Sequence, residues 1–372
     1  MPVKKYIDLF YQYFEVMMKF FYCIALVFTL FSIACKKDNP QEPEAVTKSS
    51  KSWTFQLGDY TVIPNHLNVP IYAWFPDGHI SIILNERADS SSQYIMFWAE
   101  FENYRSVGPT PFPEDQLRLE PETPVFGKRG DWSGYNNGGS WLKSVFRQSE
   151  TQLIGFYHAE DHWYPRNKDY IAWKSIGLAT SNDNGKSWTD FEQIITSSTP
   201  KPSSPQWGGA GDCCVIWHEK DKRWICYYQN HNIRMAISDD PDGRPGTWYK
   251  YYQGTFSEKG LGGKSTPLAG LSDVPGSNPS VHYNTYLKLW IMVYHGWNPT
   301  CIYISSSEDG YVWKKPQVLV TGEQGGRAWY PTIIGESDVS ADERAKLYYA
   351  DFTPDGRSRN FASQAIRFIR ND

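Results

Sequence analysis

The chain has 372 residues, of which 16% are aromatic, including 16 Trp and 25 Tyr. Its formal net charge of −4 argues against the basic surface that nucleic acid would require. The 29 Gly and 24 Pro punctuate short apolar runs rich in β-forming residues, so the composition favours one large all-β domain over two average domains. The abundant Trp and Tyr suit a partner with apolar faces and many hydroxyls, such as a sugar.

Residues 1–35 are interpreted as a targeting segment. From Met18 the chain has a positive start, an apolar stretch and small residues before a cysteine, the order of a secretory signal. The sequence SIAC at 32–35 resembles a bacterial lipobox, which implies that Cys35 is lipidated and that Met18 is the true start. A transmembrane anchor is the alternative, although the apolar run is shorter than the ~20 residues that span a bilayer.

Both alternatives place the bulk of the protein outside the cytoplasmic membrane. We expect an exported, membrane-anchored lipoprotein at the outer membrane, cell surface or periplasmic face, and the segment resembles those of Bacteroidetes-type surface lipoproteins. Residues 36–52 are polar and contain proline, which predicts a flexible tether. The folded domain is expected to cover 53–372.

The cysteines after the tether do not form a disulfide framework or a zinc motif. Four remain, Cys213, Cys214, Cys226 and Cys301, and none lies in a CxxC spacing. We interpret them as small core residues with at most one bridge. No cofactor is expected.

The strongest internal signal is SNDNGKSW at 181–188. It resembles the Asp box, a hairpin turn in which Asp caps backbone amides, Gly takes positive φ and Trp packs underneath. A looser copy at 306–313 has Glu308 where the Asp belongs, and an expanded copy occupies 238–248. Because such turns recur in successive blades of sialidase-like propellers, three copies predict a β-propeller.

Reading outward from these turns gives four-stranded antiparallel blades. The expected innermost strands are 69–75, 140–146, 212–218, 279–284 and 329–335. The expected second strands are HISIILN, QLIGFYHAE, RWICYYQN, KLWIMVYHGW and KLYYADF. The prediction is an all-β, five-bladed β-propeller whose ring is closed by the N-terminal strand within 53–63, beside SQAIRFI near the C-terminus.

This layout resembles the five-bladed glycoside hydrolase propellers, a group with arabinanases, β-xylosidases, fructan hydrolases and mannoside phosphorylases, over residues 53–370. The resemblance implies hydrolysis of a poly- or oligosaccharide by two-carboxylate chemistry. It also leaves open a structural Ca²⁺ in the propeller channel. We expect a carbohydrate as partner, no nucleic acid, and a monomer.

Strand direction predicts which residues face the site. In antiparallel blades the innermost strands start, and the second strands end, on one face of the disc. The substrate-binding candidates on that face are His158, His162, Asp131, Trp132, Asn137, Trp207, His231, His295, Trp297, Arg327 and Tyr330. The opposite face contains ordinary turn sequences.

Glu160 and Asp212 are the expected catalytic pair. Glu160 ends a strand among aromatic residues, which can raise its pKa and make it an acid. Asp212 opens an innermost strand after glycines that permit close approach of substrate. The reserve carboxylates are Glu86, Asp131, Asp161 and Asp351. Arabinanase-like propellers place three acids on successive innermost strands, whereas this chain has Asn68, Asn137 and Asp212 at the expected places.

Three alternatives stay open. A non-catalytic propeller would bind glycans on Trp132, Trp207, Trp297 and Trp329. A polysaccharide lyase would use His158, His162, His231 or Tyr330 as the base, and a sialidase would need arginines such as Arg87, Arg166 and Arg327. Metal ligation by His158 and His162 is disfavoured because GFYHAEDHWY reads as a strand, and zinc binding by HxxxH requires a helix.

Overall fold

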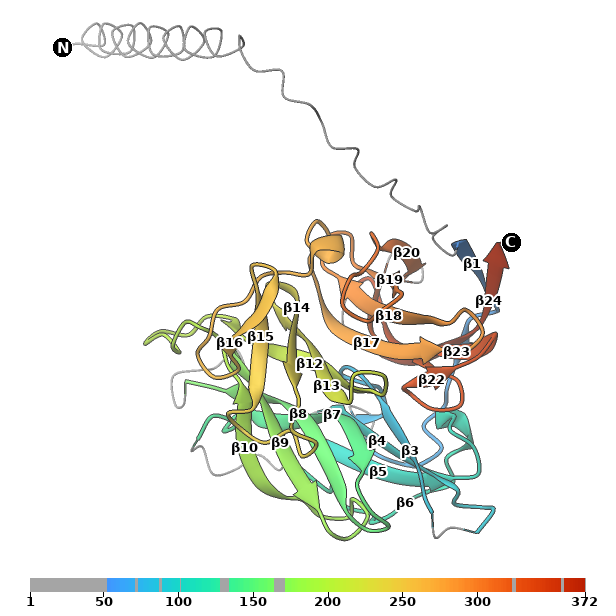
Figure 1. Cartoon of the computed structure of the whole chain (residues 1–372). Coiled ribbons are helices and arrows are strands. Elements are labelled where there is room, and N and C mark those ends of the chain that lie inside the picture. Colours follow the sequence, from blue (N-terminus) through green and yellow to red (C-terminus); the bar gives the residue numbers. More distant parts are fainter. Residues whose placement is uncertain are drawn as a thin grey trace, which may run out of the picture. The chain divides into compact units, whose positions relative to one another are not determined.

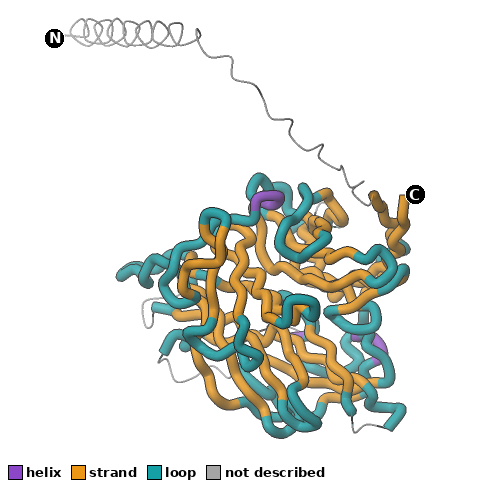
Figure 2. Tube along the Cα trace, viewed as in Figure 1, coloured by secondary structure: helices purple, strands orange, loops and turns teal. Residues whose placement is uncertain are grey.

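The computed structural model describes residues 52–371 except 71–72, 87–88, 101, 128–133, 164–170, 323–325 and 356–357. Cys35, Arg87, Asp131, Trp132 and Arg166 therefore lie outside the described residues. Strands dominate what is described, with the short 3-10 helices η2 (Pro113–Asp115) and η3 (Ala269–Leu271) between them (Figure 2). No helix in these described ranges is long and apolar enough to cross a membrane.

Five sheets follow one another along the chain as the blades of a propeller (Figure 1), which confirms the predicted fold class. Blade 1 contains β3 (Ser81–Leu84), β4 (Tyr94–Glu100), β5 (Glu102–Gly108) and β6 (Arg118–Leu119). Blade 2 contains β7 (Gly139–Arg147), β8 (Leu153–Asp161), β9 (Trp173–Ser181), β10 (Thr189–Ile195) and the short β11 (Gly208–Gly209). Blade 3 contains β12 (Gly211–His218), β13 (Arg223–Asn230), β14 (Asn232–Ser238), β15 (Trp248–Tyr252) and β16 (Thr255–Lys259).

Blade 4 contains β17 (Gly276–Asn284), β18 (Leu289–Gly296), β19 (Cys301–Ser307), β20 (Gln317–Thr321) and the short β22 (Ser340–Ala341). Blade 5 contains β21 (Arg327–Ile334), β23 (Arg344–Phe352), β24 (Arg359–Asn371), β1 (Ser52–Leu57) and β2 (Thr61–Val62). β1 pairs antiparallel with β24 from Ser52 opposite Asn371 to Leu57 opposite Ile366. The predicted closure of the ring by an N-terminal strand is therefore confirmed.

The assignment of blade 1 was wrong by one strand. Residues 69–75, expected as the innermost strand, contain no strand among the positions described there. The innermost strand is β3, which was expected to be the second. The Pro-Asp-Gly sequence at 76–78 is not the hairpin turn that its composition indicated; instead, residues 85–93 join β3 to β4. Glu86 is consequently an exposed turn residue at the far end of β3.

The predicted turns occupy the connections between third and fourth strands. In the turn at 181–188, the Asp183 carboxylate accepts the Ser187 amide at 2.9 Å, and Gly185 has φ +83°. In the copy at 306–313, Asp309 and not Glu308 accepts the amides of Tyr311 and Val312. The acceptor in this copy is therefore one residue later than expected, while Gly310, with φ +78°, and the buried Trp313 keep their expected positions.

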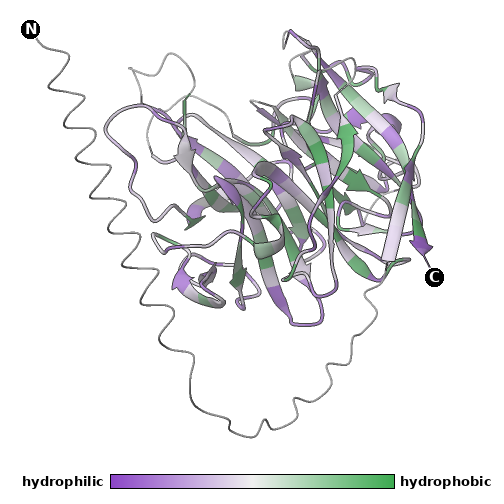
Figure 3. Cartoon of the chain, turned by 90° about the horizontal axis from the view of Figure 1, so that it is seen from above, coloured by the Kyte–Doolittle hydropathy of each residue, from purple (hydrophilic) through white to green (hydrophobic). Residues whose placement is uncertain are grey.

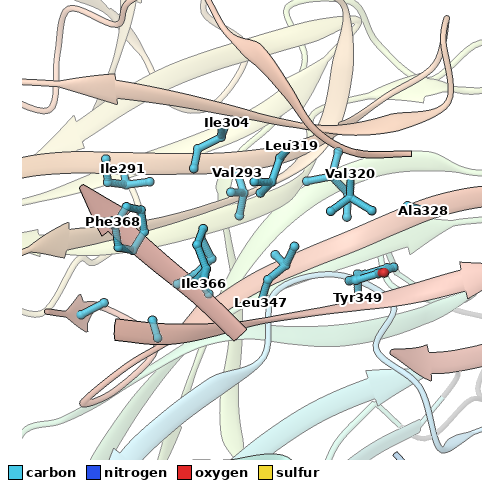
Figure 4. Close-up of a cluster of buried hydrophobic side chains, with 14 of the residues drawn as sticks. Ile291, Val293, Ile304, Leu319, Val320, Ala328, Leu347, Tyr349, Ile366 and Phe368 are labelled. Atoms are coloured by element: carbon cyan, nitrogen blue, oxygen red, sulfur yellow. The ribbon is translucent and has the colours of Figure 1, made fainter. Parts of the chain in front are cut away.

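Apolar side chains fill the spaces between neighbouring blades. Figure 4 shows one such layer, in which Ile291 and Val293 of blade 4 pack against Leu347, Ile366 and Phe368 of blade 5. Hydrophobic residues are concentrated on the strands and hydrophilic residues on the loops (Figure 3). Burial of these faces supplies the main stabilisation of the ring.

Candidate functional site

Four innermost strands share an irregularity near their first residues. The antiparallel register shifts between Leu142 and Ser144, Gly211 and Cys214, Ser277 and Ser280, and Trp329 and Thr332. A bulge of this kind turns one side chain out of the regular alternation. The residues at the shifts include Lys143, Asp212, Asn278 and Tyr330, and the last three have φ between +49° and +59°.

These residues line a single cavity of about 520 Å³, together with Asp77 from the approach to β3. Gly78 is required at this point, because a Cβ there would collide with Lys143 Nζ and Asn278 Oδ1. Each of the five blades thus contributes at least one residue to this cavity, counting Asp77 with the blade that it precedes.

The cavity brings together most of the described candidate residues. It is lined by His158, Glu160, Trp207, Asp212, His231, His295, Trp297 and Tyr330. Three candidates do not line it. His162 lies behind Glu160, Asn137 donates to Asp161 at 2.7 Å, and Arg327 lies over the Trp329 ring at 4.9 Å.

The reserve carboxylates have structural partners. Asp161 forms an ion pair with Lys201 at 2.6 Å, and Asp351 accepts the Tyr60 hydroxyl at 3.1 Å. Asn68 is exposed and does not line the cavity. Asp161, Asp351 and Asn68 are therefore strand-end or loop residues outside the site.

Glu160 is held between two imidazoles. His158 Nε2 lies 3.3 Å from Oε1, and His162 Nε2 lies 2.8 Å from Oε2. Burial alone would raise the pKa of Glu160, but the hydrogen bonds from His158 and His162 outweigh it and lower the pKa from 4.5 to about 2. The expectation of a raised pKa is wrong, because the aromatic surroundings were considered without the two histidines.

His158 connects this carboxylate to Asp212. Its Nδ1 accepts the Asp212 backbone N–H at 2.9 Å, so its Nε2 carries the proton that is donated to Glu160. Nδ1 also lies 3.6 Å from Asp212 Oδ1. With one imidazole ring between them, the carboxyl groups of Glu160 and Asp212 are less than ~10 Å apart, within the range of two-carboxylate cleavage.

Asp212 is a buried carboxylate with a cation beside it. Oδ2 accepts Lys174 Nζ at 2.6 Å and the Ser277 hydroxyl at 2.7 Å. Burial would raise the pKa of Asp212, but the charge of Lys174 beside it holds that pKa well below the usual range. Burial would lower the pKa of Lys174, but the negative charge of Asp212 and the hydrogen bond to it raise this pKa. Asp212 is therefore ionised at neutral pH.

Asp77 and Lys143 also line the cavity, although the sequence analysis did not include them among the candidates. Asp77 is partly exposed, lines the cavity together with Tyr330, and its charge contributes to the raised pKa of that phenol, after burial. Lys143 is buried, donates to the Asp77 carbonyl, and has its pKa lowered by burial against the opposing charges of Asp77 and Asp212. Lys143 could not be found from the pattern because it lies in the middle of a predicted strand, at a register shift that leaves no clear signal in the sequence.

Aromatic rings form the walls and the rim. Trp207 and Trp297 are 57% and 41% exposed, which is unusual for indole side chains in this chain. His295 stacks on Trp329 at 4.9 Å, and burial lowers its pKa to about 3, so this imidazole is neutral. Exposed flat rings beside carboxylates are the surface that a sugar ring contacts.

Metal ligation receives no support from the described residues. No group of three or more His, Cys, Asp or Glu within the described ranges is placed to hold a metal ion. His158 and His162 instead donate to Glu160.

The pH dependence of the free energy of unfolding should reveal the hydrogen bonds from His158 and His162 to Glu160. A carboxyl whose folded pKa lies below its unfolded value contributes stability above about pH 4.5, and this stability is lost as pH falls towards 2. Glu160→Gln should lower the free energy of unfolding by up to about 3 kcal/mol at pH 6, and the deficit should shrink as the pH approaches 2. Denaturant unfolding at several pH values measures it, with exposed Glu122→Gln as the control. If Glu160→Gln lowered the free energy of unfolding by the same amount at every pH, the lowered pKa of Glu160 would be contradicted.

A scan against protein-family models finds no match for the chain, and a search of curated proteins finds none either. Solved structures do resemble it. Zg3597, a family 117 glycoside hydrolase from Zobellia galactanivorans, has a TM-score of 0.51 at 12% identity over 85% of this chain and 90% of that one. A thermostable family-43 glycoside hydrolase has a TM-score of 0.47 at 12% identity over 83% and 92%. A putative hydrolase from Bacteroides ovatus has 0.49 at 14% identity over 80% and 86%. At this identity the likeness shows the fold.

Proposed function

We propose that this chain is a glycoside hydrolase that cleaves a poly- or oligosaccharide by carboxylate chemistry. The observation that carries the proposal is the convergence of Asp77, Glu160 and Asp212 in one cavity rimmed by exposed tryptophans. A five-bladed propeller that resembles glycoside hydrolases supports it. Glycoside cleavage needs one protonated and one ionised carboxyl group across the scissile bond.

The lowered pKa values of two of the three carboxyl groups suggest which role each takes in the cavity. Among its described lining residues, the carboxyl groups of Asp77, Glu160 and Asp212 face two ammonium groups, those of Lys143 and Lys174. Because Glu160 and Asp212 are held ionised, we assign the third carboxyl group of the cavity, that of Asp77, as the general acid.

Asp212 then acts on the opposite side of the sugar. Its Oδ2 is fixed by Lys174 and Ser277, which leaves Oδ1 as the atom that activates water or attacks the anomeric carbon. Glu160 is reassigned from acid to a positioning residue, since its two oxygens orient His158 and His162. The aromatic rim formed by Trp207 and Trp297 stacks on sugar rings that continue out of the cavity.

A glycan panel tests the activity. The purified protein is incubated with neutral and acidic plant, algal and host polysaccharides, and reducing ends and ultraviolet absorbance are both followed. Hydrolysis releases reducing ends without absorbance, whereas a lyase produces an unsaturated uronide that absorbs. Absorbance with every active substrate would replace hydrolase by lyase, and binding without any product would leave a glycan-binding protein.

We also propose that the protein is exported and lipid-anchored, because the sequence at 18–35 has the order of a lipoprotein signal. Cys35→Ser should move the protein from the membrane fraction to the soluble fraction, since the lipid supplies the anchor. Fractionation followed by immunoblotting measures the change, and Cys23→Ser, in the same segment, is the matched control. Retention of Cys35→Ser in the membrane fraction would indicate a transmembrane anchor instead.

A further inference from the structure

A second cavity lies at the other end of the innermost strands. Its volume is about 590 Å³, and its wall includes Phe146 at the end of β7, His218 at the end of β12, and Tyr283 near the end of β17. The opposite ends of β12 and β17 carry Asp212 and Ser277, which line the first cavity. The second cavity is therefore on the face of the propeller away from the candidate catalytic residues.

Aromatic side chains dominate the second cavity. Its rings are those of Phe146, Trp217, Tyr283, Trp290 and Tyr311, and each is partly exposed. Trp290 stacks on the buried His218 at 5.3 Å with an interplanar angle of 27°, which holds the indole in one orientation. A fixed, partly exposed indole offers a flat apolar surface to a ligand at a small entropic cost.

Hydrogen-bond acceptors lie between the rings. Glu219 accepts the Trp217 indole N–H at 2.8 Å, and Asp221 accepts the Tyr311 hydroxyl at 2.7 Å. His218 is 4% exposed, and its Nδ1 lies 3.1 Å from Asp221 without completing a hydrogen bond. The cavity thus combines apolar faces with acceptors and one buried, unsatisfied ring nitrogen.

The charge of the wall restricts the ligand. The described lining contains four acidic residues, Glu219, Asp221, Glu308 and Asp309, against one lysine, Lys220. Uronates, sulfated sugars and phosphates would be repelled. A neutral sugar satisfies the wall, because its C–H faces stack on indole while its hydroxyls donate to carboxylates.

We propose that this cavity is a second carbohydrate site, which binds one or two neutral sugar units on the face opposite the catalytic cavity. The choice of a sugar as ligand rests on the proposed function, because the polymer that the enzyme cleaves would also supply the sugar units bound in the second cavity. A volume of about 590 Å³ falls within the range of small-molecule sites. Bound here, the polymer stays near the protein between cleavages, which raises its effective concentration at the catalytic cavity.

Calorimetric titration tests the site. The Asp212→Asn protein, which should not turn substrate over, is titrated with neutral xylo-, arabino-, galacto- and agaro-hexasaccharides and with an oligouronate. We expect two sites per chain for one neutral series, and one site after Trp290→Ala, with at least a tenfold loss of affinity at the second site. Trp297→Ala, at the catalytic cavity, is the matched control that should remove the other site. Trp217→Ala provides a second variant if Trp290→Ala fails to fold.

Activity separates this inference from the proposed function. Trp290→Ala in the otherwise unaltered chain should keep the wild-type rate on a soluble aryl glycoside and lose several-fold in rate on the polymer. Three results would overturn the second site. The first is a single binding site in the parent protein, and the second is binding by Trp290→Ala and Trp217→Ala that equals that of the parent. The third is binding of tetramethylammonium, a cation that aromatic rings also bind, when no sugar binds. Trp290-dependent binding without any hydrolysis would instead overturn the proposed function and leave the second site standing.

Discussion

Asp212→Asn should lower kcat on glycosides by roughly 10²–10⁴-fold, the usual contribution of a group that moves a proton or attacks in the transition state. The amide has nearly the shape of the carboxylate but cannot hold the negative charge that Lys174 stabilises at 2.6 Å. The loss should be similar on natural oligosaccharides and on aryl glycosides with good leaving groups, because both need the base or nucleophile. Steady-state rates on the two substrate types measure it.

Asp77→Asn should separate the two substrate types. An acid protonates the leaving group, so its removal slows cleavage of sugars by a similar factor, while an activated aryl leaving group departs with at most about a tenfold loss. The matched control is Asp161→Asn, which ends β8 one residue after Glu160 but pairs with Lys201 outside the cavity; it should stay within twofold of wild type. Wild-type activity in Asp212→Asn would refute the assignment, and equal losses on both substrates in Asp77→Asn would make Asp77 the base.

The sequence predicted the fold well because the relevant signals are local. Turn chemistry at 181–188 and the alternation of short strands specify hairpins, and hairpins joined in series give blades. The prediction of the strands in blade 1 was wrong for a local reason as well. Pro-Asp-Gly at 76–78 is a strong turn sequence, and it was therefore read as a hairpin. No sequence feature within 69–80 indicates that Asp77 lines the cavity. Because the innermost strand was assigned to 69–75 instead of β3, Asp77 was placed in a turn and was not considered as a site residue.

The site was harder to predict than the fold because bulges decide which side chains face it. Lys143 lies in the middle of β7, at the register shift between Leu142 and Ser144, and it lines the cavity there. A register shift of this kind leaves no clear signal in the sequence. The error over Glu160 has another origin. Its neighbours in sequence, His158 and His162, were candidates for the same face of the disc, but the direction of a pKa shift depends on hydrogen-bond geometry, which residue spacing does not contain.

Lys174→Met should shift the pH dependence of the reaction as well as its rate. The lysine is the largest single influence that keeps Asp212 ionised against its burial, so its removal raises the pKa of Asp212. Because the base must be ionised, the acidic limb of the kcat/KM profile should move to higher pH by about one unit or more, and kcat at neutral pH should fall by roughly 10–10²-fold. A purely structural role would lower the rate without moving the limb.

Two variants complete this test. Lys174→Arg restores a positive charge and should return the acidic limb close to its wild-type position, even if the rate recovers only in part. Lys201→Met removes an ammonium group with the same 2.6 Å contact to a carboxylate, Asp161, but outside the cavity, and should leave the profile unchanged. An unmoved limb in Lys174→Met would mean that ionisation of Asp212 does not limit the reaction at low pH. The assignment of Asp77 as the acid would then be wrong as well, because it depends on Asp212 being held ionised by the same ion pair.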